Sequence, residues 1–120
     1  MRDPNCIFCK IVNNEIPSQK YFEDENFLAI FDIKPITPGH LVLLSKNHYV
    51  NINEMPENEW RQFVSLARQL AEKYIRENNL DGYNLLINQG EAAQSGVAHR
   101  PHCHIIPRTI NDGLKIDPRG

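Results

Sequence analysis

HRPHCHIIPR, residues 99–108, contains three of the five histidines of this 120-residue chain. The β-branched residues in it predict a strand over residues 102–106, which a proline should close. Because side chains alternate across a strand, His102 and His104 should share one face while Cys103 faces the other way. Two imidazoles side by side on a rigid element favour nucleophilic, general-base or metal-binding chemistry over a role as satisfied core histidines.

Length, charge and cysteine content narrow the class of protein. We expect one domain, residues 1–120, in which residues 109–120 form an extended C-terminal tail. A net charge of −2 does not indicate nucleic acid or an anionic membrane as a partner. No run reaches the roughly 18 apolar residues of a membrane span, and the polar N-terminus lacks the apolar core of a signal peptide. Three cysteines, an odd number, argue against a secreted disulfide scaffold, so we expect a cytoplasmic protein.

The remaining sequence predicts short strands around one long helix. Residues 21–22 and 27–31 read as a hairpin, and residues 41–44 and 82–88 as further strands. Between Pro56 and Asn78, apolar residues recur at helical spacing, which predicts a long amphipathic helix. A short amphipathic stretch, residues 7–16, stops before Pro17. His40 follows a loop with two prolines and a glycine, where a structural and an active-site role are equally plausible.

Cys6 and Cys9 form a C-x-x-C pair. Such a pair can be half of a zinc site, a redox pair or a coincidence. A redox pair would follow the strand of a βαβ unit, whereas only five polar residues precede Cys6. The sequence therefore favours zinc, with two further ligands required from elsewhere in the chain.

Several ordered motifs carry a resemblance to a known family. They are C-x-F-C-K-I at residues 6–11, I-P at 16–17, D-I-x-P at 32–35, G-H-L-V at 39–42, K-x-H at 46–48, N-x-G at 88–90 and H-x-H-I-I-P-R at 102–108. In this order they resemble the histidine-triad (HIT) family, in its Hint-like branch, over nearly the whole chain. The resemblance implies an α+β fold, with an antiparallel five-stranded sheet, one long helix and a short N-terminal helix. It also implies a homodimer that joins two such sheets.

The resemblance further implies a nucleotide hydrolase. His102 would attack the α-phosphorus of a purine nucleoside phosphoramidate, or of a dinucleoside polyphosphate, and release AMP through a covalent nucleotidyl-histidine intermediate. Histidine is a sensible nucleophile because an unperturbed imidazole, with a pKa of about 6.5, is mostly neutral at pH 7. His104 would donate to the phosphate, and its identity favours hydrolysis because transferase branches carry glutamine there. His40 would orient the other imidazoles.

Residues for the nucleotide and for zinc also follow from the resemblance. The implied nucleotide-binding residues are Ile7, Phe8 and Phe31 at the base, Asp32 at the ribose, Asn88 near the phosphate, and Gln94 and Ser95 near the leaving group. The implied ligands of a structural zinc ion are Cys6, Cys9, His48 and His99, a closed Cys2His2 set.

The triad departs from the family at one point. His99 and His102 are three residues apart where the family has two, which predicts a β-bulge at Arg100 and Pro101. The alternative places Arg100 on the catalytic face. Residues 93–97 also scramble the family's A-G-Q-S-V order. A non-catalytic nucleotide-binding or protein-interaction module is therefore the alternative function, and a redox or metal-transfer protein is a third.

Overall fold

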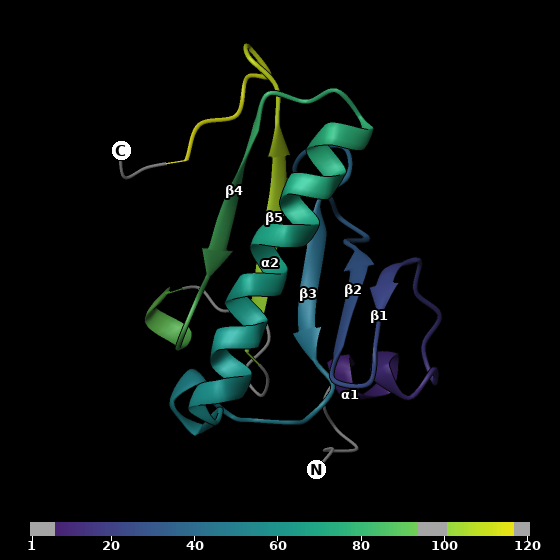
Figure 1. Ribbon diagram of the computed structural model, residues 1–120, viewed down its shortest axis with the longest axis vertical. Coiled ribbons are helices and arrows are strands. Elements are labelled where there is room, and N and C mark those ends of the chain that lie inside the picture. Colours follow the sequence, from purple (N-terminus) through teal and green to yellow (C-terminus); the bar gives the residue numbers. More distant parts are fainter. Residues whose placement is uncertain (1–6, 94–100, 117–120) are drawn as a thin grey trace.

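A computed structural model describes residues 7–93 and 101–116 of the chain (Figure 1). Five strands form one antiparallel sheet in the order β1-β2-β3-β5-β4. The strands are β1 (Lys20–Glu23), β2 (Phe27–Phe31), β3 (Leu41–Ser45), β4 (Gly82–Ile87) and β5 (His102–Arg108). The helices are α1 (Ile7–Val12), α2 (Glu57–Glu77) and the 3-10 turns η1 (Ile52–Glu54) and η2 (Glu91–Ala93). This arrangement confirms the α+β fold expected from the sequence.

The two faces of the sheet are covered by different helices. Long helix α2 lies across the front face in Figure 1 and buries Phe63, Ala67 and Leu70 against it. Strands β2 and β3 contribute alternate residues to each side, so Leu43 packs under α2 while Leu44 packs under α1. Because helices cover both faces, β2 and residues 41–44 of β3 are continuous apolar runs without a polar face.

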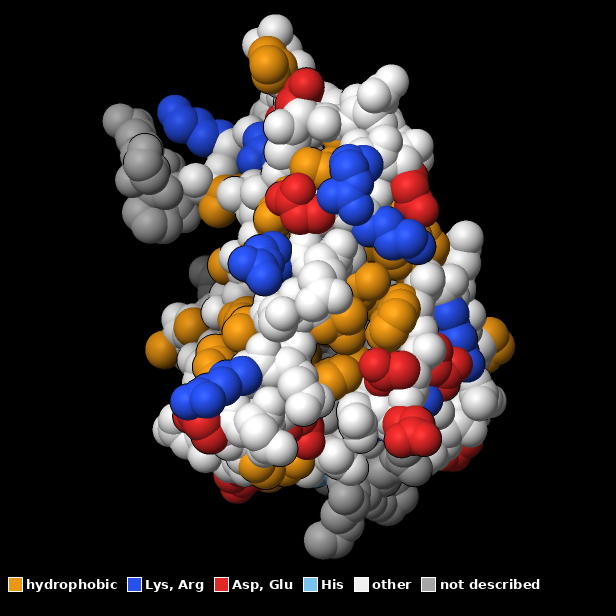
Figure 2. Space-filling model, in the orientation of Figure 1, with side chains coloured by type: hydrophobic (Ala, Val, Ile, Leu, Met, Phe, Trp, Pro, Cys, Tyr) orange, Lys and Arg blue, Asp and Glu red, His pale blue; other side chains and the backbone are white. Residues whose placement is uncertain are grey.

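Helix α2 begins one residue after Pro56 and ends before Asn78, as the sequence pattern predicts. Glu57 and Glu59 lie in its first turn, where acidic side chains complement the positive end of the helix dipole. Figure 2 shows the face of the molecule that carries α2, where charged side chains lie around an apolar hollow between α2 and β1, lined by Phe22, Leu66 and Leu70. None of the helices in the described part of the chain is long and apolar enough to cross a membrane.

Strand β5 continues through Pro107 to Arg108, which corrects the expectation that this proline closes the strand. The pairing of β5 with β3 ends at Ile105, whereas its pairing with β4 continues to Arg108. Pro107 therefore pairs on one side only, opposite Tyr83. A residue without an N–H is tolerated there because the missing donor has no β3 partner to lose.

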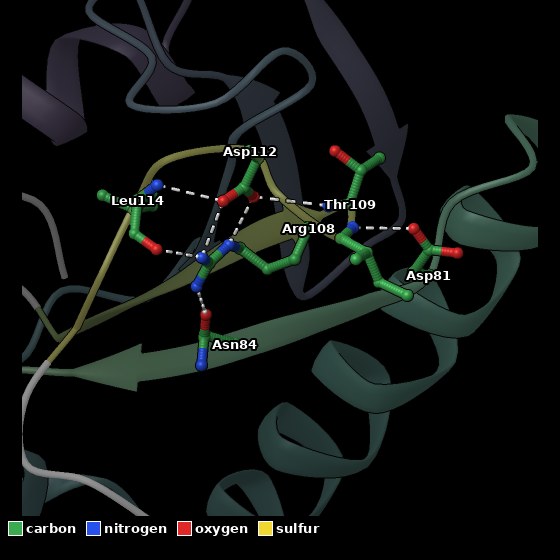
Figure 3. Close-up of polar contacts among 7 residues, drawn as sticks. Asp81, Asn84, Arg108, Thr109, Asp112 and Leu114 are labelled. Carbon is green, nitrogen blue, oxygen red and sulfur yellow. Dashed lines mark hydrogen bonds and ion pairs between the residues drawn. The ribbon is translucent and has the colours of Figure 1, made fainter.

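The chain after β5 is fastened to the sheet by Arg108 (Figure 3). Its guanidinium donates to both carboxylate oxygens of Asp112, to Asn84 Oδ1 on β4 and to the carbonyl oxygen of Leu114. The hydrogen bonds from Arg108 hold the pKa of Asp112 well below its usual range. Residues 109–114 thus form a turn that Arg108 holds in place, whereas the sequence analysis expected an extended tail from residue 109 onward.

Candidate active site

Strand β5 places His102 and His104 on the face of the sheet that α2 does not cover. They pair with Leu44 and Val42 of β3, which belong to the core on the α1 side. Cys103, between them, belongs to the core under α2. The two imidazole rings lie 5.0 Å apart between centroids, and His102 is only 3% exposed. The predicted alternation is confirmed, and it puts the two histidines side by side.

The loop of residues 32–40 brings two more functional groups to this face. It connects the upper ends of β2 and β3 in Figure 1, and a hydrogen bond of 2.9 Å from Asp32 N–H to the His40 carbonyl oxygen closes it. His40 Nε2 lies 2.9 Å from His104 Nδ1 and 3.7 Å from an oxygen of Asp32. The loop therefore delivers Asp32 and His40 to the histidine strand, so the structure brings together all three residues expected to be catalytic.

Hydrogen-bond partners define the tautomers of this cluster. The N–H of Ile36 donates to His40 Nδ1 at 3.3 Å, so the proton of a neutral His40 is on Nε2. That Nε2–H can donate to His104 Nδ1, which leaves the proton of a neutral His104 on its Nε2. The result is a relay from the loop backbone through His40 to an N–H donor on His104. Nothing in the sequence motif indicates the role of Ile36, because its contribution comes from the backbone.

Burial keeps both members of the relay neutral at pH 7. Desolvation, together with the neighbouring His102 and His40, lowers the pKa of His104 from 6.5 to about 4, and Asp32 opposes this shift. Desolvation also lowers the pKa of His40, again against the effect of Asp32. Since His40 is neutral, its 3.7 Å contact with Asp32 is not an ion pair at neutral pH.

Asp32, His40 and His104 also have the composition of a metal site, since their ligand atoms lie within 4.8 Å of one another. A metal would need the lone pair of His40 Nε2, which would force the ring proton onto Nδ1. That proton would then face the N–H of Ile36. The cluster is therefore better suited to a hydrogen-bond relay than to a cation.

Helix α1 forms one wall beside His102. The ring of Phe8 meets the His102 imidazole edge to face, with centroids 5.1 Å apart. Ile7, one residue earlier, is half-exposed, as a residue at the open side of a binding surface would be. Ile30 of β2 belongs to the same core as α1, and Phe8 packs against that core. The structure thus places Phe8 beside the nucleophile candidate and adds Ile30, which the sequence analysis missed.

The expected position of Phe31 needs correction. Phe31 packs against the core under α2 and contacts Tyr21 and Tyr74 edge to face. It therefore lies on the opposite side of the sheet from Phe8 and His102. The physical reason is strand alternation, which gives neighbouring residues of β2 opposite faces. Ile30, and not Phe31, is the β2 residue on the side of the histidines.

Two further elements bear on the expected phosphate and leaving-group contacts. Asn88 directly follows Ile87, which pairs with Cys103, so Asn88 lies at the end of β4 next to His102 in register. Gln94 and Ser95 lie outside the described residues, and so does Arg100, at which the bulge was expected.

Two of the four expected zinc ligands are described, and they are in contact. Cys9 Sγ of α1 lies 3.2 Å from Nδ1 of His48, which is in the segment after β3. Ligands of one tetrahedral zinc ion lie roughly 3.5 Å apart, given Zn–S and Zn–N bonds of about 2.3 and 2.1 Å. Cys6 and His99 lie outside the described residues. Cys103 is buried under α2, and burial raises its pKa to about 12, so it is an inert thiol.

Comparison with known proteins agrees with this geometry. A family model for the HIT domain matches residues 13–111. Since this covers most of the chain, the protein belongs to the HIT domain family. The family assignment made from the sequence motifs is thereby confirmed.

Several relatives and solved structures are similar along most of the chain. An uncharacterized HIT-like protein of Methanocaldococcus jannaschii is 43% identical over 108 residues, which are 90% of this chain and 82% of the relative. Adenylylsulfatase HINT3 of Arabidopsis thaliana is 36% identical over 92% of this chain and 55% of its own length. Adenosine 5'-monophosphoramidase HNT1 of Saccharomyces cerevisiae is 37% identical over 88% of this chain and 64% of its own length. A Zn-bound histidine triad family protein from Mycobacterium smegmatis has a TM-score of 0.86 at 37% identity, over 96% of this chain and 84% of that one.

Proposed function

We propose that this protein is a Hint-like nucleotide hydrolase that cleaves purine nucleoside phosphoramidates at the α-phosphate and releases AMP. The observation that carries the proposal is the 2.9 Å contact between His40 and His104, with the His102 ring beside them. Two relatives whose names state activities on adenylyl compounds, an adenylylsulfatase and an adenosine 5'-monophosphoramidase, support this substrate class. Dinucleoside polyphosphates are the neighbouring substrates.

In the proposed mechanism, His102 attacks the α-phosphorus while the P–N bond of the substrate breaks, and the leaving nitrogen, protonated beforehand, departs as the neutral amine. Water then attacks the phosphorus of the nucleotidyl-histidine, which releases AMP and frees His102. His104 Nε2–H donates to a phosphate oxygen as negative charge builds up in the transition state. His40 keeps the proton of His104 on Nε2, because the Nε2–H of His40 donates to Nδ1 of His104. A neutral donor suits this role since it needs no charge in a buried site.

The remaining contacts would bind the nucleoside. Phe8 lies against His102, so a base stacked on its exposed side would have its phosphate close to that imidazole. One oxygen of Asp32 accepts from the Lys34 N–H at 2.8 Å, which fixes the carboxylate and leaves its other oxygen for a ribose hydroxyl. Asn88 would contact the phosphate, with Gln94 and Ser95 near the leaving group.

We propose that Cys6, Cys9, His48 and His99 hold a structural zinc ion. The 3.2 Å contact between Cys9 and His48 supports this, as does the zinc in the similar mycobacterial structure. Zinc content measured after Cys9→Ser should fall well below one ion per chain. Cys103→Ser is the matched control, because it removes a buried thiol under α2 and should leave the zinc content unchanged. Equal zinc content in both variants would contradict the site.

We also propose a homodimer that joins two sheets through β4. Strand β4 is at one edge of the described sheet, and Leu85 on it is 41% exposed. An edge strand with apolar side chains is a ready pairing surface. Light scattering should give twice the chain mass, and Leu85→Lys should shift the mass toward the monomer. A monomeric wild type would refute the dimer.

The hydrolase proposal is tested by AMP release from adenosine 5'-phosphoramidate. His102→Ala should abolish turnover while it retains the wild-type fold and AMP binding. Cys103→Ala is the matched control, since it changes the next residue of β5, whose side chain points to the other face. No turnover in the wild type despite AMP binding would instead favour a non-catalytic nucleotide-binding module.

A further inference from the structure

The loop of residues 32–40 carries two site residues, and residues 33–36 within it are exposed. Ile33 is 89% exposed and Ile36 is 52% exposed. Asp32 and His40 stand at the two ends of the loop and reach the histidine strand from there. Within the loop, His40 is held by hydrogen bonds with the backbone of Ile36 and Thr37. Side-chain packing that positions it must come from neighbouring elements that contact the ends of the loop.

One side chain of α2 reaches both ends of this loop from the other side of the sheet. The ring of Tyr74 lies over Gly39, which has a φ of +83°; a Cβ placed there would be 2.2 Å from the Tyr74 hydroxyl oxygen and 2.5 Å from its ring carbons. Tyr74 also meets Phe31, the residue before the loop, with ring centroids 6.2 Å apart. Figure 1 shows the C-terminal part of α2 over these upper ends of β2 and β3.

Tyr74 is itself held firmly. Its ring meets Tyr21 edge to face at 5.5 Å between centroids. The hydroxyl of Tyr21 donates to Glu77, three residues further along α2, at 2.6 Å. The ring is thus fixed between β1 and its own helix, so it can act as a rigid stop for the backbone of Gly39.

We propose that Tyr74 is a positioning residue, which presses on Gly39 and so holds His40 at hydrogen-bond distance from His104. Glycine is required at position 39, because any side chain there would collide with the phenol ring of Tyr74. A shift of about 1 Å would break the 2.9 Å contact between the imidazoles, and misplacement of that size can cost about 100-fold in rate. The effect on rate rests on the proposed function, but the position of His40 can be measured without turnover.

The first test compares Tyr74→Ala, Tyr74→Phe and Tyr21→Ala by NMR of ¹⁵N-labelled imidazoles and by turnover of adenosine 5'-phosphoramidate. Tyr74→Ala should average the nitrogen shifts of His40 between tautomers and lower kcat about 10- to 100-fold, with little change in the AMP affinity. Tyr74→Phe keeps the ring over Gly39 and should restore both readouts. Tyr21→Ala removes the ring that supports Tyr74 but leaves the Tyr74 ring itself in place, so it should change both readouts less than Tyr74→Ala does. A fixed tautomer in Tyr74→Ala would overturn the proposal, even if the wild type proves to be inactive.

A second test uses the free energy of unfolding. Gly39→Ala should be strongly destabilising in the wild type because its methyl group meets the Tyr74 ring. In a Tyr74→Leu background the same change should cost less, since a shorter side chain leaves room and only the strain at positive φ remains. Additive effects of the two substitutions, measured by urea unfolding, would show that the ring does not press on Gly39 and would overturn the proposal.

Discussion

Acidification should destabilise this fold through His104. The pKa of His104 is about 4 in the folded chain, against about 6.5 for a free imidazole, so between these values the unfolded chain binds more protons. Its contribution to stability is complete above pH 6.5 and is lost as the pH falls toward 4. The difference between these two pKa values corresponds to about 3 kcal/mol in the free energy of unfolding, of which about 2 kcal/mol is lost between pH 7.5 and pH 5. His40, whose pKa burial also lowers, acts in the same direction.

The assay is urea unfolding at pH 7.5, 6 and 5 for the wild type and His104→Gln. The variant should lose about 2 kcal/mol less than the wild type over this range, because glutamine does not titrate. Glu77→Gln is the control: hydrogen bonding from Tyr21 lowers the pKa of Glu77 from 4.5, so it titrates below this range, and its slope should match the wild type. Coincident slopes for wild type and His104→Gln would refute the account of a buried, neutral His104.

Three further changes test separate parts of the structure. Phe8→Ala removes the ring beside His102, so it should raise the KM for the phosphoramidate about 10-fold with a smaller fall in kcat. Initial-rate kinetics measures both, and an unchanged KM would exclude Phe8 from the base site. Leu43→Ala should cost about 2–5 kcal/mol in urea unfolding because the side chain is fully buried under α2; a loss below that range would mean that the core collapses around the gap. The ion pair between Asp112 and Arg108 stabilises the turn after β5 and does not contact the histidines. Asp112→Asn should therefore speed amide hydrogen exchange at Leu114 and leave the imidazole signals of the site unchanged. Exchange at Leu114 as slow as in the wild type would contradict that role.

The parts of the fold that were predictable from the sequence are those with a local signal. The strict alternation of a strand was enough to place His102 and His104 on one face and Cys103 on the other. The apolar spacing of α2, together with Pro56 before it, located the helix to within a residue at either end. The two prolines and the glycine before β3 likewise indicated the loop that presents His40.

No such local signal exists for Phe31, which the sequence analysis placed on the wrong face, or for the contact between Tyr74 and Gly39, which it missed. Strand β2 reads FLAIF, apolar throughout, because α1 covers one face and α2 the other. With no polar residue to mark a side, the sequence could not tell that Ile30 faces the histidines and Phe31 faces away. The contact between Tyr74 and Gly39 joins residues 35 positions apart in the chain, and no periodicity reports it.

The central claim is that His102 is the nucleophile of a two-step hydrolysis. The most direct measurement is rapid quenching in alkali, which spares the acid-labile P–N bond, during turnover of adenosine 5'-phosphoramidate, followed by mass spectrometry at alkaline pH of the peptide that contains residues 102–108. The wild type should carry an AMP adduct on His102 that appears before free AMP reaches its steady rate, and His102→Ala should carry none. AMP release by His102→Ala at the wild-type rate, or an adduct that maps to another residue, would contradict the account.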